Sequence, residues 1–181
     1  MATADLLAEG VLYNCSARIE KKEGVETPAG NVTEQGLLRF LLDLKVPCQK
    51  ILLKKDEHIL QVIPFNSLRK KATTAIRHPS NPKLIRIFCK GAPEIVLSCV
   101  NKMFDRSGQV VYIDEAKKNE IMKKIVAEKF AVKAYRTLLI AYADYTEDEL
   151  QRLQQANNNF EKEADREALE RNLTLIGIYA L

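Results

Sequence analysis

A lysine follows an apolar run directly in the stretch FCKGAPE, residues 88–94. Charged side chains are almost never fully buried without a partner, so the Lys90 ammonium is expected to face water, a carboxylate or an anionic ligand. Gly91 has no Cβ and therefore permits a turn of the backbone or the close approach of a ligand. Pro93 and Glu94 are typical of a helix start, because proline suits the first helical position and an acidic side chain complements the helix dipole. The stretch is therefore predicted to form a strand-turn-helix corner, a common place for a binding site.

An aromatic ring and two cations follow another predicted strand in VIPFNSLRKK, residues 62–71. Pro64 has no N–H to donate to a neighbouring strand, so it is expected to end the strand and leave Phe65 beyond it. Arg69 and Lys70 come shortly afterwards. An aromatic ring beside two cations can stack on a nucleobase and hold its phosphates. The alternative for Phe65 is an ordinary place in the hydrophobic core.

Two further charged residues occupy positions that a binding site could use. Glu34 lies at the start of a predicted helix, where it either contacts a ligand or serves only as a partner of the helix dipole. Arg136 comes immediately before an apolar strand, where it either contacts a ligand or forms a surface salt bridge.

The side-chain patterns of common catalytic centres are missing from the sequence. The two histidines, His58 and His78, lack metal-ligand spacing, and neither a G-x-S-x-G motif nor a Walker-type glycine loop occurs. No nucleophile and base are suggested as a pair. We therefore predict neither catalytic residues nor metal ligands within this chain.

Length and composition indicate one soluble domain over residues 1–181. The chain is 46% hydrophobic and 29% charged, and no apolar run approaches the roughly 18 residues of a membrane span. The net charge of +4 arises from scattered basic pairs and one triplet, Arg69-Lys70-Lys71, so nucleic-acid binding is not expected. The four cysteines form no C-x-x-C pair and no secretory signal precedes them, which indicates a reducing, cytosolic environment.

Hydrophobic periodicity predicts an α+β fold with a mostly antiparallel sheet. We expect a helix over residues 1–19, a solvated loop at 20–24, and a second helix that Thr33 caps and that ends before Pro47. Short β-prone runs between 59 and 113 have connections too short for parallel crossovers. We also expect a long helix capped by Asp114, a strand at 137–145 and a helix that begins with a Thr146–Glu149 capping box. The tail of that helix, at 154–170, is polar and is expected to be solvated or partly disordered. A last strand is expected at 173–181. Because the sequence stops on an apolar strand, we expect it to be a piece of a longer protein.

Five segments, taken in order, resemble the nucleotide-binding domain of the P-type cation-transporting ATPases. They are GNVTEQGLL, PFNSLRK, FCKGAPE, AYRTLLIAY and LTLIGI, and the resemblance covers nearly the whole chain. GNVTEQGLLRFLLDLK and FNSLRK most resemble the calmodulin-regulated, plasma-membrane-type calcium pumps. Those pumps often carry serine where this chain has Pro93. The resemblance implies the fold of that domain, a twisted antiparallel sheet with helices on both sides.

The resemblance also implies a nucleotide site made of residues that match the family's motifs. In it Phe65 stacks on the adenine ring and Glu34 accepts a hydrogen bond from the adenine amino group. Lys90 lines the adenosine pocket, and Gly91 allows close approach. Two further cations complete the expected site: Lys70 lies along the triphosphate, and Arg136 contacts the ribose or the β-phosphate.

The parent protein implied by the resemblance is an ATP-driven ion translocase, with calcium as the expected ion. The aspartate that receives the γ-phosphate belongs to an Asp-Lys-Thr-Gly-Thr motif, and this motif does not occur here. The expected partners are therefore ATP and ADP, with Mg²⁺ in the intact enzyme, the phosphorylation and actuator domains of the same parent chain, and calmodulin on the parent. The domain is expected on the cytosolic side of a membrane, and the fragment is expected to be monomeric, to bind nucleotide and to hydrolyse nothing.

One alternative of another class remains open at this point. The basic triplet Arg69-Lys70-Lys71 could form a docking face for an acidic partner, and the chain would then be a noncatalytic interaction module.

Overall fold

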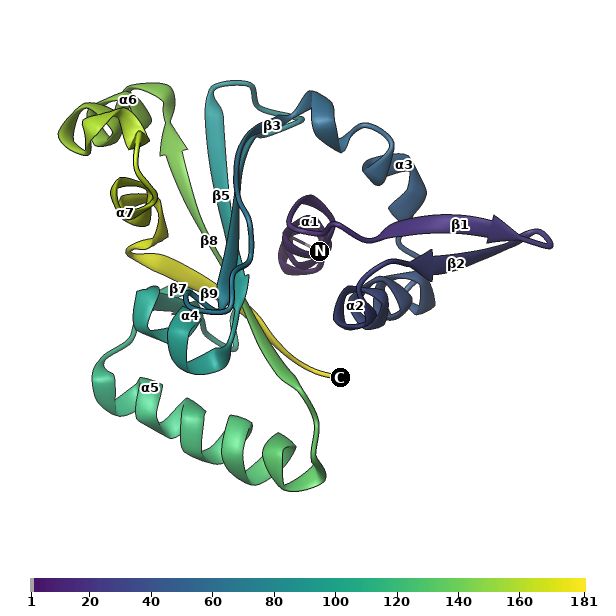
Figure 1. Ribbon diagram of the computed structural model, residues 1–181. Coiled ribbons are helices and arrows are strands. Elements are labelled where there is room, and N and C mark those ends of the chain that lie inside the picture. The colour runs from purple at the N-terminus through teal and green to yellow at the C-terminus, as the bar shows by residue number, and fades with distance from the viewer. Residues whose placement is uncertain (1) are drawn as a thin grey trace.

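A seven-stranded sheet lies at the centre of the computed structural model, which describes residues 2–181 (Figure 1). Its strand order is β3-β4-β5-β8-β9-β6-β7, and β1 and β2 form a separate two-stranded hairpin. The strands are β1 Arg18–Lys22, β2 Val25–Ala29, β3 Ile59–Ile63, β4 Lys71–Arg77, β5 Leu84–Gly91, β6 Val100–Phe104, β7 Val110–Tyr112, β8 Thr137–Thr146 and β9 Leu173–Ala180. Among the strands of residues 2–181, only β6 and β9 pair in parallel, so the predicted α+β fold with a mostly antiparallel sheet is confirmed.

Helices cover both faces of this sheet, with α1 and α2 on one side and α4 to α7 on the other (Figure 1). The α-helices are α1 Ala2–Tyr13, α2 Val32–Asp43, α3 Cys48–Leu52, α4 Pro93–Cys99, α5 Glu115–Ile121, α6 Glu147–Ala156 and α7 Glu163–Arg166. Shorter or irregular helices are η1 Lys55–Glu57, η2 Met122–Phe130, which continues α5, η3 Ala131–Lys133, η4 Asn158–Phe160 and η5 Glu167–Glu170. Across residues 2–181, none of the helices is both long and apolar enough to cross a membrane.

Strand β5 shows how the alternation of side chains divides the core. Phe88 packs in a buried cluster that includes Leu6 and Tyr13 of α1. Cys89, the next residue, packs with Val96 of α4 on the opposite face. Successive side chains of a strand point to opposite faces, so Lys90 lies on the same face as Phe88, towards α1.

The predicted strand-turn-helix corner is confirmed. Strand β5 ends at Gly91, and α4 begins at Pro93 with Ala92 as its N-cap residue. Glu94 provides the acidic group of the first turn. Asp114 also caps its helix as predicted, and Thr146 and Glu149 form the predicted capping box.

Three predictions about the N-terminal region are wrong. The first helix ends at Tyr13, and Ile19 lies in β1 instead. The charged run expected as a loop forms most of β1, and only Glu23-Gly24 turns the chain. Both residues have positive φ, at 51° and 83°, as tight hairpin turns require. The cap of α2 is Asn31, whose side chain accepts from the Thr33 and Glu34 amides, so Thr33 is not the cap.

The prediction of a solvated or partly disordered segment at 154–170 is wrong in part, because many of its residues are exposed but the segment is folded and residues 160 and 168–170 are buried. The segment folds into the end of α6 and the short helices that follow it. Phe160 and Leu169 are buried against Ile85 and Ile87 of β5. These few apolar side chains, spaced among charged ones, are enough to seal that face of the sheet. Strand β6 was not predicted either. It follows α4 directly and pairs with β9.

The chain passes unusually close to Gly91. A Cβ added there would lie 2.3 Å from the Lys70 carbonyl oxygen and 2.7 Å from the Lys71 Cα. Real Cβ atoms do not approach backbone so closely, and backbone atoms at a strand pair cannot move aside cheaply. Glycine is therefore needed here for the contact between β5 and the start of β4.

We predict that Gly91→Ala destabilises the domain by about 1 to 3 kcal/mol, because the new methyl group overpacks against backbone. Gly36→Ala is the matched control. Its Cβ would meet only the flexible end of Leu181 at 3.0 Å, and alanine is favoured over glycine inside α2. Urea denaturation measures both free energies of unfolding. A Gly91→Ala protein as stable as the Gly36→Ala protein would contradict this description of the strand contact.

Candidate functional site

Lys90 is buried and held by two oxygen atoms. Its Nζ donates to Glu34 Oε1 at 2.7 Å and to the Asn14 carbonyl at 2.6 Å. Only 7% of the Lys90 surface is exposed. Of the three partners that the sequence allowed for this ammonium, the structure shows a carboxylate. The ion pair joins the first turn of α2 to the end of β5.

The second oxygen of Glu34 is anchored by the segment after α1. Oε2 accepts from the Ser16 amide at 2.9 Å, the Ser16 hydroxyl at 2.6 Å and the Ala17 amide at 3.0 Å. Burial alone would raise the pKa of Glu34, but Lys90 and the Ser16 donors outweigh burial and lower the pKa overall. Glu34 therefore stays ionised and does more than complement the dipole of α2.

Arg136 lies beside the same helix start. Its Nη1 donates to Thr33 Oγ1 at 3.0 Å, one residue before Glu34. Its backbone N–H and C=O both pair with Leu181. The Arg136 backbone is thus fixed at the sheet end while the residue is exposed, and its guanidinium bonds to the residue that precedes Glu34.

Phe65 and Lys70 lie on the 64–70 connection between β3 and β4. Phe65 is 62% exposed, so it is not a residue of the hydrophobic core. Asn66 shapes the connection, because its side chain accepts from the Leu68 and Arg69 amides and its carbonyl accepts from the Lys70 amide. This turn presents an aromatic ring and a cation on one short loop.

The backbone of Lys70 is held by a hydrogen bond, whereas its side chain makes only an exposed ion pair. Its carbonyl accepts from the Ala92 amide at 2.9 Å, which places it against the corner after Gly91. Its ammonium lies 3.7 Å from Glu94 Oε1, and both side chains are more than half exposed. An exposed pair at this distance is worth little, so the ammonium can exchange Glu94 for another anion.

The basic docking face expected as the alternative does not form. Arg69 and Lys71 turn inwards and make ion pairs with Glu170, with only 9% and 10% of their side chains exposed. Of the triplet, Lys70 is the cation that reaches solvent. That alternative is therefore wrong, because a docking face needs its charges at the surface.

The structure thus brings most of the predicted residues together. Glu34 and Lys90 are bonded, Arg136 is linked to them through Thr33, and the backbone of Lys70 lies against Gly91. Phe65 shares its loop with Lys70. That these residues bind a ligand stays a prediction, and the space that Gly91 leaves open is occupied by the β4 backbone.

Asn14 is a site residue that the sequence did not single out. It is 6% exposed, and its side chain donates to the Ala72 and Phe88 carbonyls at 2.9 and 3.2 Å. These bonds hold its own carbonyl under the Lys90 ammonium. No sequence signal marks this role, because its partners lie far along the chain.

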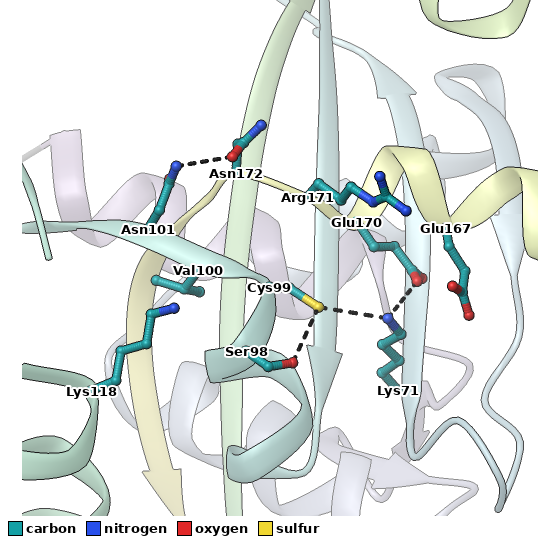
Figure 2. A pocket seen from close by; sticks show the side chains of 10 residues that line it. All are labelled: Lys71, Ser98, Cys99, Val100, Asn101, Lys118, Glu167, Glu170, Arg171 and Asn172. Atoms are coloured by element: carbon teal, nitrogen blue, oxygen red, sulfur yellow. Dashed lines mark hydrogen bonds and ion pairs between the residues drawn. The ribbon is translucent and has the colours of Figure 1, made fainter. Parts of the chain in front are cut away.

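Two cavities lie elsewhere in the molecule. One of about 540 Å³ lies on the α4 side of the sheet and is lined by residues that include Lys71, Cys99 and Glu170 (Figure 2). Another of about 220 Å³ lies beside α6. The predicted residues line neither cavity. Glu34 and Lys90 lie on the α1 and α2 side of the sheet, and Phe65 and Lys70 lie on the connection between β3 and β4. Within residues 2–181, no group of three or more His, Cys, Asp or Glu side chains could hold a metal ion.

A family model described as "P-type ATPase, cytoplasmic domain N" matches residues 2–181 of the chain. Plasma membrane calcium-transporting ATPase 4 of Homo sapiens is 34% identical over 151 residues, which cover 80% of this chain and 12% of that protein. Probable calcium-transporting ATPase 9, plasma membrane-type, of Oryza sativa subsp. japonica is 36% identical over 155 residues, which cover 81% and 14%. Putative calcium-transporting ATPase 11, plasma membrane-type, of Arabidopsis thaliana is 36% identical over 146 residues, which cover 79% and 14%. The chain therefore spans only about an eighth of the length of these relatives.

The Glu34–Lys90 pair gives a pH-dependent prediction. The folded pKa of Glu34 lies below the unfolded value of about 4.3, so its contribution is complete above that pH and is lost as the pH falls through the lowered folded value. Glu34→Gln keeps an oxygen for Ser16 but removes the charge. At pH 7 it should lower the free energy of unfolding by about 2 to 4 kcal/mol, and this difference should shrink below about pH 4. Urea denaturation at pH 7 and pH 3 measures it.

Glu26→Gln is the control, since Glu26 is exposed on β2. It should change the free energy of unfolding by less than about 0.5 kcal/mol at either pH. An equal loss for Glu34→Gln at pH 7 and pH 3 would show that the charge of Glu34 is not what stabilises the site.

Proposed function

The chain belongs to the family of P-type ATPase cytoplasmic N domains, and from this premise we propose that it binds ATP for a larger ion-translocating enzyme. The observation that carries the proposal is an exposed Phe65 ring and an exposed Lys70 ammonium on the same 64–70 connection. A ring that is 62% in water gains free energy when a base stacks on it. The neighbouring cation suits the phosphates of the same ligand.

In the proposed complex adenine stacks on Phe65 and its amino group donates to Glu34. The carboxylate has room for this bond, because Oε2 already takes three donors whereas Oε1 takes only Lys90. Adenine is recognised by stacking together with hydrogen bonds to its polar edge. The hydrogen bond to Glu34 would thus make the site prefer a base that carries an amino group.

Lys90 would contact the adenosine rather than the phosphates. An ammonium has three protons, and the Asn14 carbonyl and Glu34 take two of them. One proton remains for a ring nitrogen or a ribose oxygen. A neutral acceptor is the better partner, because the charge of Lys90 is already balanced by Glu34 and the ion pair is buried.

The outer cations would bind the charged part of the nucleotide. Lys70 would lie along the triphosphate after leaving Glu94, and Arg136 would contact the ribose or the β-phosphate. Gly91 would support this arrangement through the close contact that fixes Lys70. The phosphates would remain largely in solvent, so that another domain can reach them.

The domain would hold ATP but would not react with it. We propose that the parent delivers the γ-phosphate to an aspartate of a separate phosphorylation domain, with Mg²⁺ bound there and by the phosphates. The relatives are named calcium-transporting ATPases, which supports calcium as the transported ion. The family description names a cytoplasmic domain, which supports the cytosolic side of a membrane as the location. Further proposed partners are the actuator domain of the parent and calmodulin, and the isolated chain is proposed to be monomeric and inactive in hydrolysis.

The expected affinity is weak. One base stack contributes about 1 to 3 kcal/mol and each hydrogen bond to a charged group about 1.5 to 3 kcal/mol, against an association cost of about 4 kcal/mol or more. The balance is about −4 to −6 kcal/mol, a dissociation constant in the high micromolar to millimolar range. Weak binding suits a domain that must release ADP in every cycle.

We predict that Phe65→Ala weakens ATP binding at least about fivefold, because it removes the stacking surface. The fold should be unaffected, since the ring is exposed. Tyr112→Ala is the matched control, because Tyr112 is also exposed but lies on β7 at the opposite edge of the sheet. Isothermal titration with ATP measures both, and equal affinities for the two variants would contradict the proposed stacking.

A further inference from the structure

Glu170 is a buried carboxylate at the centre of a charged network. It is 1% exposed and lies at the end of η5. Its Oε1 accepts from Arg69 Nη2 and from the Thr73 hydroxyl, and its Oε2 lies 2.7 Å from Lys71 Nζ. Burial alone would raise the pKa of Glu170, but these three partners outweigh burial and lower the pKa. A full negative charge is thus held inside the fold by two cations.

This network lies on the face of the sheet opposite Lys90. Ala72 is the register partner of Lys90, so these two side chains point to the same face. Lys71 and Thr73 flank Ala72 along β4 and therefore point to the other face. Figure 2 shows Lys71 joined to Glu170 among the residues that line the larger of the two cavities. Glu170 therefore cannot act by touching a ligand bound near Lys90.

The two cations that Glu170 binds are the chain neighbours of Lys70. Lys70 itself adopts a left-handed backbone conformation, with φ at 53°. This conformation is unfavourable for a residue with a Cβ and persists only where the surroundings enforce it. Here the surrounding contacts enforce it. Arg69 and Lys71 both pair with the carboxylate of Glu170, and the Lys70 backbone between them bonds to Asn66 and Ala92.

We propose that Glu170 is a positioning residue for the triphosphate, because it buries the cations on either side of Lys70 and thereby presents the Lys70 ammonium alone to the nucleotide. The proposal rests on the proposed ATP binding. Without the carboxylate, three consecutive cations would repel one another and would have no shared anchor. Arg69 and Lys71 would then turn towards solvent, and the backbone of Lys70 would lose the constraint that fixes its conformation.

The test is titration of the whole 181-residue chain with ATP and, separately, with adenosine, followed by NMR. Glu170→Gln should weaken ATP binding about fivefold, the effect of one exposed charge contact, and leave adenosine binding unchanged. Glu167→Gln is the matched control, because it makes the same change on the same helix at an exposed position that lines the same cavity. It should leave both affinities unchanged.

A double-mutant cycle separates positioning from general damage to the fold. If Glu170 acts through Lys70, then Glu170→Gln should have no further effect on ATP binding once Lys70→Ala is present. An unchanged ATP affinity in Glu170→Gln, an equal loss for adenosine, or a loss that persists in the Lys70→Ala background would each overturn the proposal. If the wild-type chain binds neither ligand, ATP binding itself is wrong and the proposal falls with it.

A second variant decides the matter if Glu170→Gln does not fold. Lys71→Met removes one arm of the network and keeps the Arg69–Glu170 pair. It should weaken ATP binding about twofold to threefold and spare adenosine, on the same scale of one partly fixed charge contact. Identical ATP binding by Lys71→Met and the wild-type chain would overturn the proposal.

Discussion

One ion pair, from the buried Lys90 to the partly buried Glu34, organises the candidate site. Two segments 56 residues apart in the sequence meet through it, the end of β5 and the first turn of α2. Burying either charge alone would be costly, so each residue requires the other. The anchors around the pair follow from the same constraint, because the Asn14 carbonyl and the Ser16 donors satisfy atoms that burial would otherwise leave without partners.

The sheet separates two charged centres. Glu34 and Lys90 lie on the α1 side, whereas Glu170 and its partners lie on the α4 side. Between them, at one end of β4 and β5, the backbone of Lys70 passes Gly91 at a distance that no larger residue allows. The buried ion pairs of Glu170 can thus restrain the conformation of the surface loop at 64–70, because removing one partner of a buried ion pair is costly.

Much of this arrangement could be predicted from the sequence, for identifiable reasons. The corner at residues 88–94 could be predicted because an apolar run, a glycine and a proline are each local signals, of a strand, a turn and a helix start. The burial of Glu170 could not be predicted, because Glu170 lies in a stretch of charged and amide side chains whose composition is typical of a solvent-exposed segment. Its burial depends on Arg69, 101 residues away, and on Leu169 beside it, which packs against β5. Asn14 was missed for the same reason, since its partners lie 58 and 74 residues along the chain.

The central claim is that ATP occupies the surface between the Phe65 loop and the Glu34–Lys90 pair. The most direct test is a ¹H–¹⁵N correlation spectrum of the chain recorded with increasing ATP. The account predicts that the largest shifts fall on the amides of the 64–70 loop, the first turn of α2 and the corner at Gly91. Spectra that do not change at saturating ATP, or shifts confined to the cavity lined by Cys99 and Arg171, would contradict it.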